Sequence, residues 1–143
     1  MRKILITGSR KYGLCEAMCN LFDTMPDIEY ETASRSNGYQ LDTSEGQKKL
    51  AEKYIEGEFD IFINNSAIWK FQQVMIVEAV YNAMEEADRK GHIINIGSTA
   101  DTGVKGRTWR YPTEKKALKA YNRDLTYKAM GGSNIKTTLI SPG

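Results

Sequence analysis

Short runs of β-favouring apolar residues alternate with helix-favouring stretches along the whole chain, and this alternation limits the possible folds most strongly. The expected strands are Ile4–Ile6, Ile28–Ala33, Tyr39–Leu41, Phe59–Ile63, His92–Ile96 and Ile135–Ile140. The expected helices are Gly13–Met25, Ser44–Ile55, Phe71–Arg89 and Pro112–Met130. Most strands are apolar throughout rather than at every second residue, which indicates burial on both faces and therefore parallel pairing between helical layers.

Length and composition agree with this pattern. The 143 residues suit a single domain over 1–143, and 41% hydrophobic with 27% charged residues is ordinary for a globular chain. The sequence therefore predicts an α/β fold: a Rossmann-type, doubly wound parallel sheet of about six strands with helices on both faces. In such a sheet, ligands bind beyond the carboxyl ends of the strands.

The net charge and the length of the apolar runs indicate which kinds of partner the chain does not bind. A net charge of +2 is too small to indicate nucleic acid or an anionic membrane as partner. No apolar run approaches the roughly 18 residues of a membrane span. The first apolar stretch is too short for a signal peptide, so we expect a cytoplasmic protein with no membrane partner.

Two cysteines and one histidine offer little for a metal site. Cys15 and Cys19 lie one helical turn apart, and His92 is the single histidine. We expect the cysteines to be small apolar core residues and predict no metal site. Both cysteines lie on the expected helix Gly13–Met25. The inward face of this helix is expected to consist of Leu14, Ala17, Met18, Leu21 and Phe22.

A glycine-containing turn follows the first expected strand. Gly8 and Gly13 flank Ser9, Arg10 and Lys11, and Leu14 follows at the start of the helix. Such a turn lets main-chain N–H groups and the helix N-terminus face a pyrophosphate. Any strand-to-helix turn favours glycine, but this one follows the first strand of a βαβ unit, which favours cofactor binding.

The end of the second strand bears on which dinucleotide is bound. In this fold an acidic residue there accepts the ribose 2′-hydroxyl of NAD. Here Ser34 and Arg35 occupy that region, with Arg10 and Lys11 in the nearby turn. Cationic groups suit a 2′-phosphate, so we predict NADP(H), with NAD(H) possible; the alternative is that these are solvated surface charges.

Polar residues also follow two later strands. Asn64 and Ser66 lie after one strand and Ser98 after the next, and Tyr111 precedes Lys115 by one helical turn. A tyrosine and lysine at this spacing mean little alone. Their position, after a strand-end serine and at the start of the helix before the last strand, gives them weight.

Taken together, these segments resemble the short-chain dehydrogenase/reductase family. The matching segments, in order, are Thr7-Gly8 to Gly13, Leu41-Asp42, Asn64 to Ala67, Asn95 to Ser98, Tyr111 to Leu118, and Ser141-Pro142-Gly143. Several ordered matches over nearly the whole chain are far more specific than any single one.

The resemblance implies an oxidoreductase that transfers a hydride between a nicotinamide cofactor and a carbonyl or alcohol substrate. Tyr111 would be the general acid/base, Lys115 its partner and a ligand of the nicotinamide ribose, and Ser98 the group that orients the substrate carbonyl. A phenol is a poor base at neutral pH, and a neighbouring ammonium favours its ionised form. By resemblance Asp42 would contact the adenine and Asn64 would line the cofactor cleft. The full predicted cofactor-binding set is Gly8, Ser9, Arg10, Lys11, Gly13, Leu14, Ser34, Arg35, Asp42, Asn64, Ser66, Tyr111, Lys115, Pro142 and Gly143.

The sequence departs from the family pattern at several points. Cys15 replaces the third glycine of the turn. The asparagine that the family commonly has early in the following helix has no clear counterpart: Trp69 or Lys70 falls there, with Gln72 and Gln73 close by. The sequence stops at a Pro-Gly motif, so we expect a minimal version without the usual C-terminal substrate segment. The alternative function is a dinucleotide-binding protein with little or no turnover.

Two further expectations concern surfaces. The basic stretch Lys105, Arg107, Trp109 and Arg110 is expected to be a solvated loop rather than a nucleic-acid site, with Trp109 at the mouth of the active site. We also expect a homodimer or homotetramer, because the last two helices are rich in apolar residues and family members pair them. The candidate seam residues are Val77, Tyr81, Met84, Leu118, Tyr121 and Leu125; the alternative is that they face the chain's own sheet.

Overall fold

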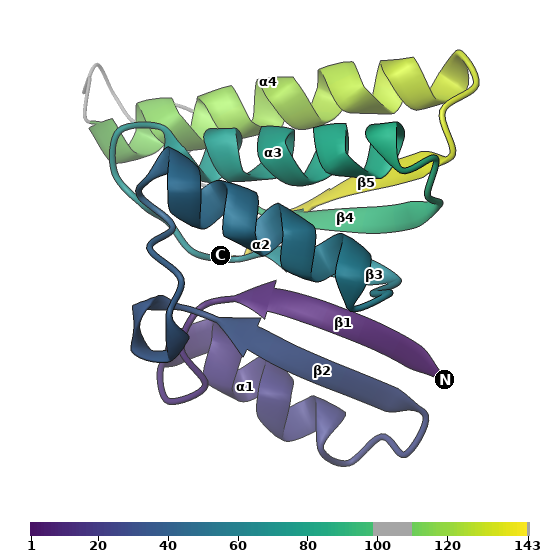
Figure 1. The fold of residues 1–143 in the computed structure, drawn as a ribbon. Helices are drawn as coiled ribbons and strands as arrows, with labels where there is room; N and C mark the ends of the chain where they lie inside the picture. Colours follow the sequence, from purple (N-terminus) through teal and green to yellow (C-terminus); the bar gives the residue numbers. More distant parts are fainter. Residues whose placement is uncertain (99–109, 143) are drawn as a thin grey trace.

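The computed structural model describes residues 1–98 and 110–142, which form one α/β layer structure (Figure 1). The strands are β1 (Arg2–Thr7), β2 (Ile28–Ala33), β3 (Ile61–Asn64), β4 (Gly91–Ile96) and β5 (Ile135–Ile140). The α-helices are α1 (Gly13–Phe22), α2 (Ser44–Glu56), α3 (Gln72–Glu86) and α4 (Arg110–Met130), and a short 3-10 helix covers Arg35–Asn37. The predicted alternation of strands and helices is confirmed, with α1 and α3 each a few residues shorter than expected.

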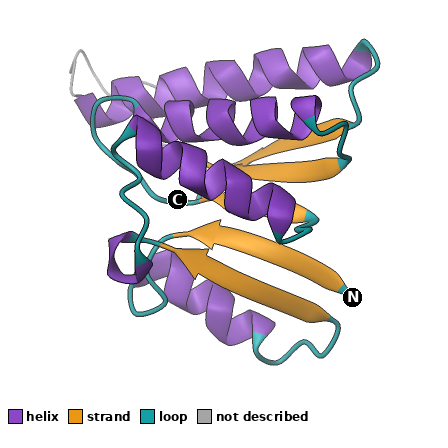
Figure 2. Cartoon of the chain, viewed as in Figure 1, coloured by secondary structure: helices purple, strands orange, loops and turns teal. Residues whose placement is uncertain are grey.

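All strand pairs of the sheet are parallel. The order is β2-β1-β3-β4-β5, so the chain leaves β1 toward one edge and then crosses back to add β3 on the other side. The direction of winding therefore reverses between β1 and β3, which is the position where open parallel sheets bind ligands. The loops that leave the carboxyl ends of the strands gather at one end of the molecule (Figure 2).

The helices cover the two faces of the sheet unequally. Helices α2, α3 and α4 pack on one face over the larger apolar core, whose biggest fully buried side chains include Tyr54, Phe62 and Tyr81. Helix α1 lies on the opposite face, over a smaller core that contains Ile4, Ile6 and Ile63. The doubly wound, Rossmann-type class is thus as predicted.

The face that α1 buries agrees only in part with the expected one: Met18 and Phe22 are partly buried against the smaller core as predicted, but the other expected residues are exposed. Cys15 and Cys19 are 2% and 0% exposed and contact the sheet, as expected of core cysteines, whereas Leu14 and Leu21 are 41% and 58% exposed. The reason is the close approach of this helix to the glycine turn, since a Cβ on Gly8 would lie 3.1 Å from Cys15 Cβ. A small side chain therefore faces inward there, and the larger leucines point away.

The structure has five strands within the described residues, not six, because Tyr39–Leu41 does not join the sheet. Turn and side-chain hydrogen bonds take up its main-chain groups: Thr43 N donates to Gln40 O at 3.1 Å, and Gln47 Nε2 donates to Leu41 O at 3.0 Å. Gln40 O also lies so close to Gly46 that a Cβ there would overlap it. The segment packs under the start of α2 instead of extending the sheet edge.

The expected dimer seam is also corrected. Five of its six residues are within the chain's own core: Val77, Tyr81, Met84, Leu118 and Leu125 are all at most 5% exposed. Both α3 and α4 turn their apolar faces toward the sheet, because a helix that covers a parallel sheet must bury a broad apolar stripe. Among the described residues, no helix is both long and apolar enough to cross a membrane.

Candidate active site

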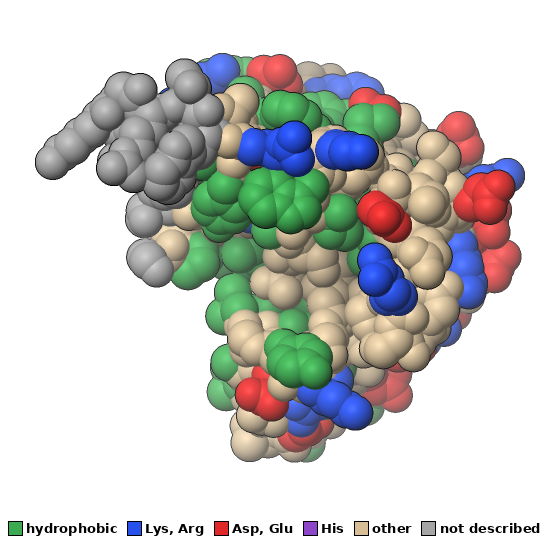
Figure 3. Space-filling view, turned by 90° about the vertical axis from the view of Figure 1, so that its left-hand side faces the viewer, with side chains coloured by type: hydrophobic (Ala, Val, Ile, Leu, Met, Phe, Trp, Pro, Cys, Tyr) green, Lys and Arg blue, Asp and Glu red, His purple; other side chains and the backbone are tan. Residues whose placement is uncertain are grey.

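The residues singled out in the sequence gather where the parallel strands end. This face of the molecule carries hydrophobic and basic side chains next to one another around a central hollow (Figure 3). The turn after β1, the 3-10 helix after β2, the segment after β3 and the first turns of α4 all open onto this side (Figure 1).

The turn after β1 is built around Gly8 and the neighbouring Thr7. Gly8 has φ +135°, and a Cβ there would lie 3.0 Å from the side-chain nitrogen of Asn65, so only glycine fits without strain. The buried Thr7 hydroxyl accepts hydrogen bonds from the main-chain nitrogens of Asn65 at 2.9 Å and Ser66 at 3.1 Å. These contacts tie the turn to the segment after β3, so the main chains that would flank a pyrophosphate are fixed relative to each other.

Within this turn, Arg10 faces helix α1. Its Nη2 donates to Asn20 Oδ1 at 2.7 Å and to Asp23 Oδ2 at 2.9 Å, and Tyr30 donates to the other oxygen of Asp23 at 2.6 Å. The hydrogen bond from Tyr30, with Arg10 beside it, lowers the pKa of Asp23. Arg10 is therefore already engaged in the described structure, whereas Lys11 is exposed.

A pocket of about 380 Å³ lies between the segments that follow β2 and β3. Four residues predicted to bind the cofactor line it: Ser34, Arg35, Asp42 and Ser66. The sequence analysis did not assign the rest of the lining, which consists of Tyr39, Leu41, Ile68, Trp69, Lys70 and Gln72. The pocket thus brings a cationic pair, an acidic residue and aromatic rings to one concave surface.

Tyr111 and Lys115 lie one turn apart at the start of α4. Tyr111 is 39% exposed, whereas Lys115 is 3% exposed, and Lys115 Nζ lies 5.7 Å from the centroid of the Tyr111 ring. Burial lowers the pKa of Lys115. Lys115 Nζ donates to Ile96 O at 2.9 Å, and Ser98 follows Ile96 by two residues, so all three predicted catalytic residues are at the end of β4.

Gln73 also contacts Lys115, and the sequence analysis gave it no role. Its Oε1 accepts from Lys115 Nζ at 2.8 Å, while its Nε2 donates to Asn64 O at 2.9 Å and Ile96 O at 3.1 Å. Gln72 and Gln73 both lie near the position where the family commonly has an asparagine, which indicated a polar side chain there. The sequence alone could not show which of the two glutamines is buried.

Asn64 does not line a cleft as expected. It is fully buried, and its Nδ2 donates to Gln73 O at 2.9 Å and to Asn95 Oδ1 at 3.0 Å; Asn95 in turn donates to Asn122 Oδ1 at 2.9 Å. Adjacent parallel strands place Asn64 and Asn95 in register, so the two amides pair across the sheet. Asn64 therefore braces β3, β4 and α3 beneath the site.

The segment that leads into α3 is strained. Lys70 and Phe71 both have left-handed backbone conformations, with φ of 63° and 60°, which cost energy for residues with a Cβ. Phe71 N donates to Glu114 Oε1 on α4 at 3.0 Å, and the Arg110 guanidinium lies 5.5 Å from the Trp69 ring centroid. Helix α4 thus holds the pocket segment from the side that carries Tyr111.

Some predicted residues lie outside the described residues: Lys105, Arg107, Trp109 and Gly143. Pro142 is described and exposed.

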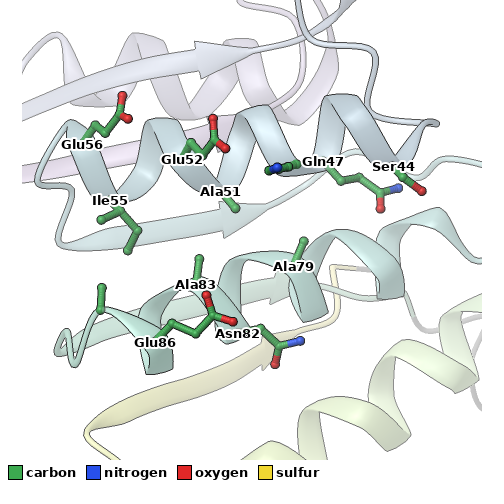
Figure 4. A pocket seen from close by; sticks show the side chains of 12 residues that line it. Ser44, Gln47, Ala51, Glu52, Ile55, Glu56, Ala79, Asn82, Ala83 and Glu86 are labelled. Carbon is green, nitrogen blue, oxygen red and sulfur yellow. The ribbon is translucent and has the colours of Figure 1, made fainter.

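A second, larger pocket of about 540 Å³ lies away from the strand ends, between α2 and α3 (Figure 4). Alanines from both helices, Ala51, Ala79 and Ala83, face each other across it, and Glu52 and Glu86 are at its margin. It is a surface groove between two helices that small side chains line, and none of the predicted site residues lines it.

The fold is that of a doubly wound α/β domain, in which ligands bind beyond the carboxyl ends of the strands, and comparison with solved structures specifies the fold further. A short-chain dehydrogenase/reductase from Burkholderia phymatum, solved with NAD, is similar with a TM-score of 0.79 and 17% identity over 99% of this chain and 65% of that one. Serine dehydrogenase from Escherichia coli gives 0.72 and 18% over 99% and 82%. A blue fluorescent protein from a metagenomic library, solved with NADPH, gives 0.71 and 22% over 99% and 74%.

This chain therefore has the fold of the short-chain dehydrogenases/reductases, and it spans 65% of the length of the Burkholderia protein. No protein-family model and no curated protein matches its sequence.

Proposed function

We propose that this chain is a member of the short-chain dehydrogenase/reductase family that binds NADP(H) and acts as an oxidoreductase on a carbonyl or alcohol substrate. The observation that carries the proposal is the joint placement of Tyr111, Lys115 and Ser98 at the end of β4, beside a pocket lined by residues predicted to bind a dinucleotide. The shared fold supports it, as do the NAD and NADPH complexes among the similar structures.

The residues present fit a dinucleotide. A Cβ at Gly8 would meet Asn65 and Cys15, so glycine lets the turn lie close to both α1 and the segment after β3. Tyr12, which precedes α1, provides no side-chain cap, so the helix N-terminus can bind an anion. The pocket between the ends of β2 and β3 would hold the adenosine half, with Asp42 and Ser66 as hydrogen-bonding groups.

Preference for NADP(H) over NAD(H) rests on Arg35. Its guanidinium belongs to the pocket lining, with Lys70 on the segment opposite. Arg35 just after β2 and Lys70 across the pocket favour a ribose 2′-phosphate, because no acidic residue directly follows β2 to accept a 2′-hydroxyl. Arg10 contributes less than expected, because Asp23 and Asn20 already bind its guanidinium.

The chemistry follows from the first turns of α4. When bound, the nicotinamide ring supplies or accepts the hydride. Tyr111 would give its hydroxyl proton to the developing alkoxide during reduction and take it back during oxidation. The buried Lys115 places its Nζ beside the Tyr111 ring. Ser98 would orient the substrate carbonyl toward both groups.

The test is a carbonyl-substrate screen with NADPH, followed by Tyr111→Phe. The variant should lose hydride transfer, measured as the change in NADPH absorbance, yet keep nearly unchanged cofactor affinity, because only the transferable proton is removed. Full activity of Tyr111→Phe on a genuine substrate would contradict the proposed chemistry. Cofactor binding without turnover on any carbonyl would instead favour a dinucleotide-binding protein.

A further inference from the structure

Lys115 is held deep in the molecule without a contacting carboxylate among the described residues. Its side chain is 3% exposed, and its hydrogen bonds go to two neutral oxygens, those of the Gln73 side chain and the Ile96 main chain. An ammonium group has three N–H donors, so these two bonds leave one donor for the open side of the site.

Gln73 is fixed in one orientation. Both hydrogens of its Nε2 are used, toward Asn64 O at 2.9 Å on β3 and Ile96 O at 3.1 Å on β4. An amide that donates through its nitrogen in this way must present its oxygen to Lys115. The main chain of Gln73 is held as well, because Asn64 Nδ2 donates to its carbonyl oxygen at 2.9 Å.

Gln73, Lys115 and Ile96 O therefore form a closed triangle of hydrogen bonds, since Ile96 O accepts from both side chains. The triangle joins the first turn of α3, the end of β4 and the first turns of α4 (Figure 1). Gln73 is 5% exposed, so water does not compete for these bonds.

We propose that Gln73 is a positioning residue of the site: it orients the Lys115 ammonium through a direct side-chain hydrogen bond, and directs the remaining Nζ donor toward Tyr111 and the bound cofactor. The consequence for catalysis rests on the proposed oxidoreductase function. The hydrogen-bonded arrangement itself does not.

A neutral acceptor at this place has a specific effect. It holds Nζ in position without the strong electrostatic stabilisation of the ammonium that a carboxylate would provide. Among the described residues, Tyr111 and Glu114 are the titratable groups beside Lys115. Burial has the larger effect and lowers the pKa of Lys115, whereas Glu114 raises it. A carboxylate at position 73 would reverse that balance, because an opposite charge at hydrogen-bonding distance raises a lysine pKa.

The test follows Lys115 directly, by NMR titration of the protein labelled at lysine Cε, with the signal assigned through Lys115→Arg. In the unmutated protein one lysine should titrate below the others. Gln73→Glu should move that midpoint upward by about 1–3 pH units. Gln73→Met, of similar length but without an acceptor, should lower the Lys115 midpoint further, because the buried ammonium loses a hydrogen-bond partner. Gln73→Asn keeps the amide but is shorter, so it should resemble Gln73→Met.

Thr137→Val is the matched control. It removes another buried polar group, the Thr137 hydroxyl on β5 that is hydrogen-bonded to Thr126 on α4, without touching the triangle. It should lower stability and leave the Lys115 midpoint unchanged. If all Gln73 variants fail to fold, the NMR titration of the unmutated protein still tests the proposal. The proposal is overturned if Lys115 has the same titration midpoint and chemical shift as the exposed lysines.

Activity separates this proposal from the one on which it rests. With a substrate in hand, Gln73→Met should reduce turnover by about tenfold to a hundredfold, and Gln73→Glu should shift the pH profile together with the Lys115 midpoint. If the Gln73 variants shift the titration midpoint of Lys115 as expected but the protein binds no dinucleotide, the proposed oxidoreductase function is refuted and the positioning role of Gln73 is not. If the protein transfers hydride but the Lys115 NMR signal stays unchanged in every Gln73 variant, the positioning role is refuted and the oxidoreductase function is not.

Discussion

Arg35 and Arg10 carry the same charge on adjacent turns, but their surroundings differ. Arg35 lines the pocket beyond β2, whereas Arg10 donates to Asn20 and Asp23 on the far side of its turn. A guanidinium that faces open space can form charge-assisted bonds with a phosphate at once, while one that is already bound must first give up its partners.

We therefore predict that Arg35→Ala removes most of the preference for NADPH over NADH. The loss of a charge-assisted phosphate contact should cost on the order of 1.5–3 kcal/mol of NADPH binding and leave NADH binding nearly unchanged. Fluorescence titration of both cofactors measures this, and Arg10→Ala is the matched control with a small effect. Equal affinities for both cofactors in the unmutated protein would contradict the assignment.

At the scale of single residues, sequence could place the chemistry but not the orientation of side chains. Tyr111 and Lys115 were predictable because helix spacing alone puts them on one face. Asn64 was misassigned because a strand-end amide can point to a ligand or to the next strand, and its neighbour Asn95 decides which. The role of Gln73 could not be predicted for the same reason, since its hydrogen-bond partners Asn64, Ile96 and Lys115 come from three different segments of the chain.

Among the elements, the helix ends show where the backbone is strained. Glu58 follows the last residues of α2 with φ 54°, in the left-handed region, and its nitrogen donates to Ile55 O at 3.1 Å. A helix commonly ends on such a residue, and glycine occupies that position without steric cost.

Glu58→Gly should therefore stabilise the protein by about 0.5–1 kcal/mol, since it relieves the left-handed backbone at the cost of some chain entropy. Glu52→Gly, at an exposed position inside the same helix, should destabilise by about 1 kcal/mol. Urea unfolding followed by circular dichroism gives both values. If Glu58→Gly lowers the free energy of unfolding, the Glu58 side chain contributes more stability than its left-handed backbone costs, and the prediction is wrong.

The elements themselves were largely predictable, because apolar runs and helical periodicity are local signals. The exception, Tyr39–Leu41, has strand-like residues but lies between Gly38 and Thr43, the N-cap of α2. The Gln47 side chain donates a hydrogen bond to the carbonyl oxygen of Leu41, which a neighbouring strand would otherwise occupy. The inward face of α1 was right for Met18 and Phe22 and wrong for Leu14 and Leu21. The close contact of Cys15 with Gly8, which is not visible in the local sequence pattern, turns the helix so that the cysteines face the sheet.

At the scale of the whole molecule, we propose assembly into a homodimer or homotetramer through the outer sides of α3 and α4. Helix α3 carries Glu78, Glu85 and Glu86 and no basic residue, with Glu85 paired with Lys128 of α4 in the same chain. The exposed side of α4 carries Lys116 and Arg123 beside one acidic residue, Asp124. Opposite charges on neighbouring helices can meet those of a second copy across a two-fold axis.

Lys116→Glu with Arg123→Glu should then produce folded monomers, detected by light scattering at micromolar concentration with circular dichroism as the check on folding. Tyr81→Asp should unfold the chain instead, because Tyr81 is 1% exposed and its hydroxyl contacts Ser133 at 3.1 Å. An unmutated protein that is monomeric under these conditions would count against assembly.

The most direct test of the account is calorimetric titration of the protein with NADPH and NADH. We predict saturable binding of one dinucleotide per chain, tighter for NADPH, which is lost when Ser66→Phe fills the pocket between the ends of β2 and β3. Asn82→Phe, which fills the groove between α2 and α3, should leave binding unchanged. Absence of binding by either cofactor, or binding that survives Ser66→Phe and is lost in Asn82→Phe, would contradict the placement of the site at the strand ends.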